Sequence, residues 1–221
     1  MFNITKKELI AFETKIVNLF KQGKLPYLLH LCGGNEDLLI DIFKEINTED
    51  YIFSTHRSHY HYLLAGGNQD TLINKICKGN SMFVFDKSIN FLSSSILAGT
   101  ACIAAGTALA LELKQSKQKV WCFIGDGAED QGHFYEAVRY VDNLGLPCTY
   151  IIEDNNRSVE STKEMRSSKN TINWPSCVIR YTYIPTYPHA GPGLSEMIEF
   201  DKETIEQYKI LIGNKNDGKT R

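Results

Sequence analysis

Two short apolar runs, each followed at once by polar residues, constrain the fold of this chain more than any other feature. The first run, residues 119–124, leads into Gly-Asp-Gly at 125–127, and the second, residues 148–152, leads into Glu-Asp-Asn-Asn at 153–156. Between them, residues 132–144 place apolar side chains at helical spacing. A strand, a helix and a strand in this order predict a right-handed parallel unit, with both polar tips at one edge of the sheet. We therefore expect a ligand to bind at that edge.

Other segments extend this pattern into an α/β fold, a parallel sheet flanked by helices on both faces. Apolar periodicity predicts helices over 6–22, 36–46 and 70–77, and an Ala- and Gly-rich composition predicts a buried helix over 98–113. Further strands are expected at 50–57 and 177–183, and loops at 78–82, 167–174 and 185–193. We expect one domain over residues 1–198 and a charged tail, 199–221, that forms a short helix and then frays.

Composition excludes several classes of partner. The 221 residues have a net charge of -2, so no basic excess attracts nucleic acid or anionic membranes. The chain contains no apolar run of about 18 residues and begins with a polar segment, so the cytoplasm is the expected location. The six cysteines are scattered without a Cys-x-x-Cys pair, which predicts reduced core thiols and no zinc site or disulfide framework.

The polar tips supply what a diphosphate cofactor requires. Gly125 and Gly127 permit close backbone approach, and Asp126 is an anionic ligand for a bridging cation. Magnesium prefers carboxylate, amide and carbonyl oxygens. Asn155 or Asn156, together with a main-chain carbonyl, would therefore complete the set of metal ligands that the protein supplies. Either tip alone would be interpreted as a turn. The intervening 27 residues, 128–154, are predicted to form a helix and a strand. These two elements return the chain to the same edge of the sheet, which favours a metal–diphosphate site.

A family resemblance agrees with this interpretation. Gly-Asp-Gly-Ala-Glu-Asp-Gln-Gly-His-Phe-Tyr-Glu-Ala at 125–137 and Leu-Pro-Cys at 146–148 resemble the thiamine diphosphate motif of the alpha subunit of 2-oxo acid dehydrogenases, the pyruvate type most closely. Upstream, residues 12–13, 19–24, 29–31 and 34–36 are similar to the family's amino-terminal helix and following loop. His-Arg-Ser-His at 56–59 resembles the family's Tyr-Arg-x-His, and residues 78–82 resemble its Lys-Gly-(Gly)-Ser-Met loop.

The resemblance implies a set of metal ligands. Asp126 would bind Mg²⁺ together with an asparagine and the carbonyl of Ser158. Counting from Asp126 as in pyruvate-type alpha subunits selects Asn155, whereas matching Asn-Asn-Arg selects Asn156. We favour Asn156.

The resemblance also implies cofactor contacts. Gly125, Gly127 and Ala128 would lie along the diphosphate, and Arg57 would pair with its phosphate through a bidentate guanidinium. His56 stands in place of a family tyrosine and would donate a hydrogen bond. Leu97 would contact the aminopyrimidine through its backbone. Ser95 stands in place of a family glycine in the same loop.

Two histidines are candidate catalytic residues by resemblance. His59 matches a family histidine near the active-site channel, where it would stabilise a charged intermediate or shuttle protons; a loop or surface histidine is the alternative. His189, in Tyr-Pro-His-Ala-Gly at 187–191, is similar to the family's active-site loop. The closely spaced His56, His59 and His61 have no carboxylate or cysteine at matching spacing, which argues against zinc, and we expect His61 to be structural.

The resemblance implies an enzyme that depends on a second chain. We expect an alpha-like subunit that decarboxylates a 2-oxo acid with thiamine diphosphate and Mg²⁺ and passes the acyl group to a carrier. A beta-type subunit would supply the glutamate that activates the aminopyrimidine, in an α2β2 heterotetramer. Two alternatives stay open: a two-chain transketolase-like or carboligating enzyme, which the short C-terminal third favours, and a catalytically silent cofactor-binding scaffold.

Overall fold

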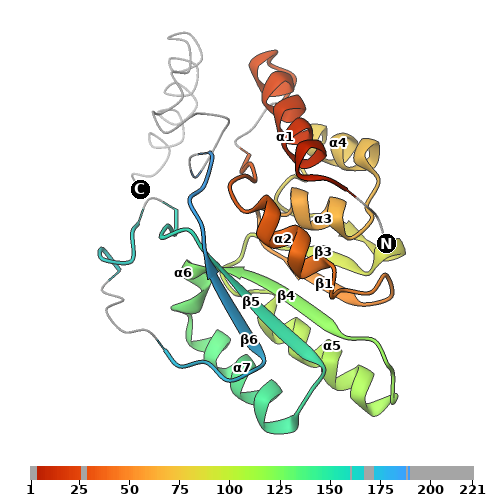
Figure 1. Ribbon diagram of the computed structural model, residues 1–221, viewed down its shortest axis with the longest axis vertical. Helices are drawn as coiled ribbons and strands as arrows, with labels where there is room; N and C mark the ends of the chain where they lie inside the picture. The colour runs from red at the N-terminus through yellow and green to blue at the C-terminus, as the bar shows by residue number, and fades with distance from the viewer. Residues whose placement is uncertain (1–3, 26–28, 160, 167–171, 188, 190–221) are drawn as a thin grey trace, which may run out of the picture.

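A six-stranded, mostly parallel sheet forms the centre of the protein (Figure 1). The computed structural model describes residues 4–25, 29–159, 161–166, 172–187 and 189. The strands in sheet order are β2 (Phe85–Asp86), β3 (Phe91–Ser93), β1 (Tyr51–Ser54), β4 (Val120–Gly125), β5 (Cys148–Asp154) and β6 (Val178–Thr182). All neighbouring pairs are parallel except β2 with β3. The predicted α/β class is confirmed, with one short antiparallel strand added at an edge.

The register of β4 and β5 places the two polar tips side by side. Val120 pairs with Cys148 at one end of the ladder, and Gly125 pairs with Glu153 at the other. The pairing of the strands' carboxyl ends confirms that residues 125–127 and 153–156 lie at the same edge of the sheet.

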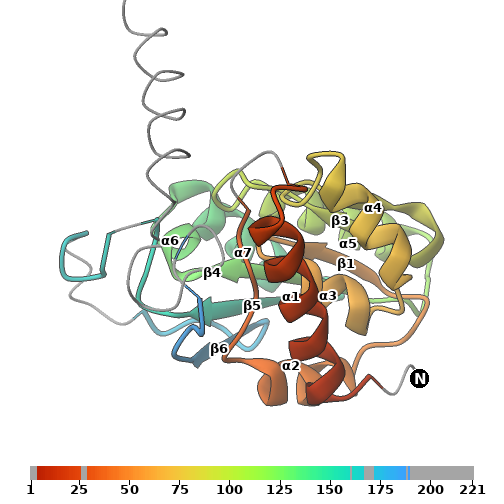
Figure 2. The same ribbon diagram turned by 90° about the horizontal axis from the view of Figure 1, so that it is seen from above.

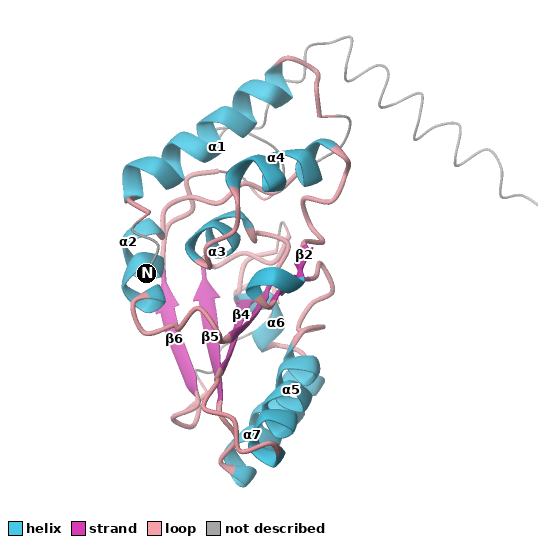
Figure 3. Ribbon diagram, turned by 90° about the vertical axis from the view of Figure 1, so that its right-hand side faces the viewer, coloured by secondary structure: helices cyan, strands magenta, loops and turns pink. Residues whose placement is uncertain are grey.

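Helices cover both faces of the sheet (Figures 2 and 3). Helices α1 (Lys6–Lys21), α2 (Glu36–Phe43), α3 (His59–Leu64) and α4 (Gln69–Cys77) pack on one face. Helices α5 (Ala101–Leu113) and α7 (Gly132–Leu144) pack on the other, and the short α6 (Asp126–Glu129) begins directly after β4. A 3-10 turn, η1 (Lys87–Ile89), separates β2 from β3. None of the described helices is both long and apolar enough to cross a membrane.

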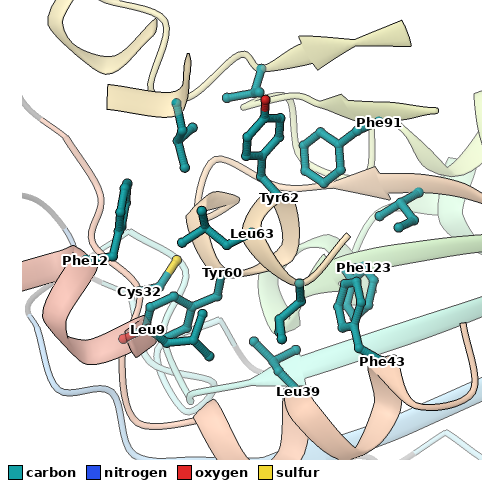
Figure 4. Close-up of a cluster of buried hydrophobic side chains, with 14 of the residues drawn as sticks. Leu9, Phe12, Cys32, Leu39, Phe43, Tyr60, Tyr62, Leu63, Phe91 and Phe123 are labelled. Atoms are coloured by element: carbon teal, nitrogen blue, oxygen red, sulfur yellow. The ribbon is translucent and has the colours of Figure 1, made fainter. Parts of the chain in front are cut away.

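Alternation along the strands divides the core into two clusters. On β4, Trp121 and Phe123 face the α1–α4 side, while Val120, Cys122 and Ile124 face the α5–α7 side. Figure 4 shows the first cluster, in which side chains of α1, α2 and α3 converge on the sheet. Burial on both faces explains why β4 and β5 are continuous apolar runs in the sequence.

Several local expectations required correction. Helix α5 is buried on one face only, because Ile103 is 50% exposed and Leu113 is 77% exposed. Leu144, expected on the packed face of α7, is 51% exposed at its end. The cysteines are free thiols, but only Cys32, Cys122 and Cys148 belong to the core, whereas Cys77 and Cys102 are exposed. The expected domain limit at residue 198 and the tail at 199–221 lie outside the described residues.

Candidate functional site

A cavity of about 180 Å³ opens at the carboxyl ends of β1, β4 and β5. It lies at the edge that the sequence predicts for ligand binding. Most of the predicted site residues line this cavity: His56, Arg57, Ser95, Leu97, Gly125, Asp126, Gly127, Ala128, Asn155, Ser158 and His189. The described lining includes neither His59 nor Asn156.

The two glycines of the first polar tip differ in what surrounds them. A Cβ atom on Gly125 would meet no atom within 4 Å, so this backbone is open to the cavity. A Cβ atom on Gly127 would lie 2.1 Å from Oγ of Ser158. Gly127 is therefore required by the packing of the protein itself, whereas Gly125 leaves room for a bound group.

Asp126 is a buried carboxylate with one oxygen that lacks a hydrogen-bond partner. Its side chain is 1% exposed, and its Oδ2 accepts a hydrogen bond of 2.7 Å from the guanidinium of Arg166. Its Oδ1 is buried and has no hydrogen-bond partner among the described residues. Burial raises the pKa of this carboxyl, although Arg166 acts in the opposite direction. Such a group gains stability from a cation placed beside Oδ1.

Oppositely charged pairs surround Asp126. Arg166 also donates through Nε to Asp130 at 2.8 Å. On the neighbouring strand, Asp154 pairs with Lys163 and Arg180. The sequence alone assigned no role to Lys163, Arg166 and Arg180, because a charged side chain does not reveal its partner when that partner is distant in sequence.

The two asparagines of the second polar tip lie in different environments. Asn155 is partly buried, lines the cavity and donates from Nδ2 to the hydroxyl of Tyr183 at 3.3 Å. Asn156 is exposed, has a φ of 58° and accepts a hydrogen bond of 3.1 Å at Oδ1 from the amide of Lys163. This geometry favours Asn155 over Asn156 as the neighbour of Asp126, and the identity of the metal ligand stays a prediction.

The three histidines at 56–61 do not converge. The ring of His59 is fully buried, with Nδ1 at 2.9 Å from Glu13 Oε1 and Nε2 at 2.9 Å from Ser81 Oγ. The ring of His61 is also buried and contacts Ser54 and Glu153, which fits the structural role expected for it. Helix α3 begins at His59 and turns these side chains away from the cavity lining. These three residues therefore do not form a zinc site.

His56 instead meets two histidines that are distant in sequence. The ring centroid of His30 lies 4.5 Å from that of His56 and 4.6 Å from that of His189. Arg57 donates hydrogen bonds to the carbonyls of Leu31 at 2.7 Å and His189 at 2.9 Å. These bonds hold the backbone at Leu31 and His189 against the cavity-lining residue Arg57. His30 lies within the Leu-His-Leu segment that resembles the family, but the sequence alone gave no reason to assign it a role in the site.

Burial keeps these three rings neutral at physiological pH. Desolvation is the largest cause in each case and lowers the pKa of His56 to about 2. The pKa values of His30 and His189 are lowered to about 4 by the same effect. The guanidinium of Arg57 acts in the same direction on all three.

Glu153 lines the cavity and is the centre of a hydrogen-bond network. Its Oε1 accepts hydrogen bonds from Asn35 at 3.0 Å and from the hydroxyl of Tyr181, and lies 3.2 Å from Nε2 of His61. These contacts connect the start of α2, helix α3 and strand β6 to the end of β5. The sequence places Glu153 in the second polar tip, but this supporting role became evident only from its contacts in the structure.

Comparisons with known proteins agree with this architecture. The family model described as "Dehydrogenase E1 component" matches residues 5–178. The alpha subunit of acetoin:2,6-dichlorophenolindophenol oxidoreductase from Bacillus subtilis (strain 168) is 33% identical over 175 residues, which cover 75% of this chain and 53% of that protein. The pyruvate dehydrogenase E1 component alpha subunit of Rickettsia bellii (strain RML369-C) is 33% identical over 161 residues, covering 67% and 48%. That of Porphyra purpurea is 26% identical over 193 residues, covering 75% and 56%.

The chain therefore belongs to the dehydrogenase E1 component family, whose members generally bind thiamine diphosphate and Mg²⁺. The relatives it resembles are alpha subunits. It spans about half the length of the curated relatives it matches.

The contact between Gly127 and Ser158 predicts a stability effect. We expect Gly127→Ala to lower the free energy of unfolding by about 1–3 kcal/mol, the usual cost of overpacking. Adding Ser158→Gly should restore much of this loss, because it removes the atoms that the new methyl group meets. Gly125→Ala is the matched control and should change stability little. Urea unfolding of the four proteins tests this, and equal effects of the two alanines would contradict it.

Proposed function

We propose that this chain is the alpha-like subunit of a two-chain thiamine diphosphate-dependent enzyme that acts on a 2-oxo acid. The observation that carries the proposal is Asp126, a buried carboxylate with an unpartnered Oδ1 at the cavity wall, next to the open backbone of Gly125. Because the chain belongs to the dehydrogenase E1 component family, we interpret Asp126 and Gly125 as part of a site for the cofactor and its metal ion. A bound thiamine diphosphate would supply carbanion chemistry toward a substrate carbonyl.

The residues present fit a metal–diphosphate group. Asp126 would provide an anionic oxygen ligand, and its unpartnered Oδ1 needs a cation. Asn155 or Asn156 and the carbonyl of Ser158 are the further candidate ligands. Gly125, Gly127 and Ala128 would allow the diphosphate to approach the backbone.

The polar side chains across the cavity would orient the cofactor and substrate. Arg57 would pair with phosphate oxygens, and His56 would donate a hydrogen bond from its ring. Leu97 and Ser95 lie in the loop that would face the aminopyrimidine. His189 would hold or move a proton near the reacting carbonyl, since its pKa is lowered to about 4 and its ring is neutral at physiological pH.

His59 would act on the cavity indirectly, through its contact with the loop at residues 78–82. Its ring bridges Glu13 of α1 and Ser81, which precedes the cavity residue Met82. We therefore assign His59 the role of positioning the 78–82 loop. The proton-shuttle role suggested by the family resemblance requires access that its full burial does not provide.

A beta-type partner would complete the site. The cavity of about 180 Å³ is smaller than the range of about 300–1,000 Å³ usual for ligand sites, which supports a site shared between two chains. The partner would supply the glutamate that activates the aminopyrimidine, in an α2β2 assembly. The relatives are named as alpha subunits, which supports the same arrangement.

Loss of the Asp126 charge should weaken cofactor binding strongly. We expect Asp126→Asn, copurified with the partner chain, to bind thiamine diphosphate and Mg²⁺ at least about a hundredfold more weakly, about 2.7 kcal/mol. Asp130→Asn is the matched control, because it also removes a partner of Arg166 but lies outside the cavity lining. Calorimetry measures both. Unchanged binding by Asp126→Asn would overturn the proposal.

Arg166 should compete with the metal for Asp126. Because its guanidinium pairs with Asp126 Oδ2, we expect Arg166→Met to bind Mn²⁺, a paramagnetic substitute for Mg²⁺, about tenfold more tightly without cofactor. Lys163→Met removes a nearby charge that pairs with Asp154 instead, and should have a smaller effect. Electron paramagnetic resonance of free Mn²⁺ measures both affinities. Weaker binding by Arg166→Met would show that Arg166 supports the site.

A 2-oxo acid is the proposed substrate, and acetoin is a second candidate. The Bacillus subtilis relative is named for acetoin and 2,6-dichlorophenolindophenol, and the Rickettsia bellii relative for pyruvate. We expect the complex with its partner to reduce 2,6-dichlorophenolindophenol with a 2-oxo acid as electron donor. Reduction with acetoin alone would favour the second candidate. Carboligation of an added aldehyde without dye reduction would identify a transferase, and cofactor binding without turnover would identify a scaffold.

A further inference from the structure

Three imidazoles meet at one wall of the cavity, and their arrangement goes beyond the proposed function. His30, His56 and His189 each offer a ring nitrogen, and these nitrogens lie within 4.8 Å of one another. We propose that they form a second metal site, selective for a divalent transition-metal ion such as Zn²⁺ over Mg²⁺. This site uses nitrogen where the Asp126 ligand set uses oxygen. With the metal bound, His56 and His189 would be ligands and would not fill the hydrogen-bonding and proton-transfer roles that the proposed function gives them.

The ring geometry matches a three-imidazole site. With Zn–N bonds of about 2.0–2.1 Å and tetrahedral angles, the ring centroids of three histidine ligands lie on the order of 5 Å apart. The observed separations are 4.5 Å for His30 and His56, 4.6 Å for His30 and His189, and 5.6 Å for His56 and His189. Small side-chain rotations would therefore bring the nitrogens onto one ion. Three protein ligands leave a fourth position open to the cavity.

The hydrogen bonds of these rings supply a second, independent observation. Nε2 of His56 is buried and has no hydrogen-bond partner among the described residues, so its lone pair or proton is unsatisfied without a ligand. Nδ1 of His30 lies within hydrogen-bonding distance of the His189 carbonyl. Donation of Nδ1–H to that carbonyl leaves Nε2 of His30 as a free lone pair, as is usual for metal-bound histidines.

The third imidazole distinguishes this chain from the family it resembles. His56 occupies the position of the tyrosine in the family's Tyr-Arg-x-His segment. A tyrosine there would leave only His30 and His189 in the cluster. On the resemblance of residues 56–59 to that segment, the three-nitrogen set is a property of this sequence and is not implied by family membership.

The type of ligand atom determines which metal the cluster favours. Arg57 lies beside the histidines and opposes any cation. Mg²⁺ gains little from imidazole nitrogen, whereas Zn²⁺ forms strong bonds to neutral imidazole. We therefore expect the ion to be a transition metal.

A second buried cluster serves as a contrast. Glu13, Cys32 and His59 also place their ligand atoms within 4.8 Å of one another. Glu13 Oε2 is buried and has no hydrogen-bond partner among the described residues. However, Glu13 Oε1 already accepts from the Cys32 amide and bonds to His59, and none of the three residues lines the described cavity through which an ion would enter. We assign no metal to this cluster.

Cobalt and zinc titrations of the full chain test the proposal. We expect one equivalent of Co²⁺ to give the visible absorption of a four-coordinate nitrogen and oxygen site, and Zn²⁺ to displace it while Mg²⁺ does not. His56→Tyr, the family-like residue, should weaken Zn²⁺ binding at least about tenfold, measured against a chelating dye. His189→Asn should have the same effect. His133→Gln removes a histidine outside the cluster and should bind as the parent does.

Specific outcomes would overturn the proposal. Thiolate-to-cobalt charge-transfer absorption would assign the ion to the exposed Cys77 or Cys102 instead. Equal Zn²⁺ affinity in the parent, His56→Tyr and His189→Asn would exclude the cluster. Circular dichroism of each variant establishes that it is folded, and two variants with different replacements guard against a loss caused by misfolding of one.

Discussion

The site depends on the parallel pairing of β4 with β5. Their ladder ends with Gly125 opposite Glu153. It brings together the Gly-Asp-Gly and Asn-Asn motifs, which 27 residues, 128–154, separate along the chain. Both strands are buried on both faces, between α1–α4 and α5–α7. A slip of one residue would turn every side chain to the opposite face, so packing of the two cores fixes the register and, with it, the cavity wall.

Two buried carboxylates at this edge are accommodated in different ways. Glu153 receives hydrogen bonds from the neutral groups of Asn35 and Tyr181, so its charge is distributed into a polar network. Asp126 pairs with Arg166 on one oxygen and has no described partner on the other. Burying a carboxylate is costly unless every oxygen is matched. Glu153 therefore supports the cavity wall, and Oδ1 of Asp126 is the atom best suited to bind a cation.

Local sequence patterns predicted the longer elements. Helix α1 follows from its apolar period, and β4 and β5 follow from apolar runs longer than four residues. Helix α3 was missed because its six residues are all buried and show no amphipathic period. The short strands β2 and β3 were missed because two or three residues give too little pattern to detect.

By itself, the sequence determined the class of fold and the edge at which the site lies, because strand and helix periodicity and the Gly-Asp-Gly turn are encoded by neighbouring residues. Only the tertiary structure decided which side chains meet there. It placed Asn155 in the cavity lining and left Asn156 exposed. It separated His56 from His59 and grouped it with His30 and His189. Such meetings depend on the paths of loops over a packed sheet, which no local propensity specifies.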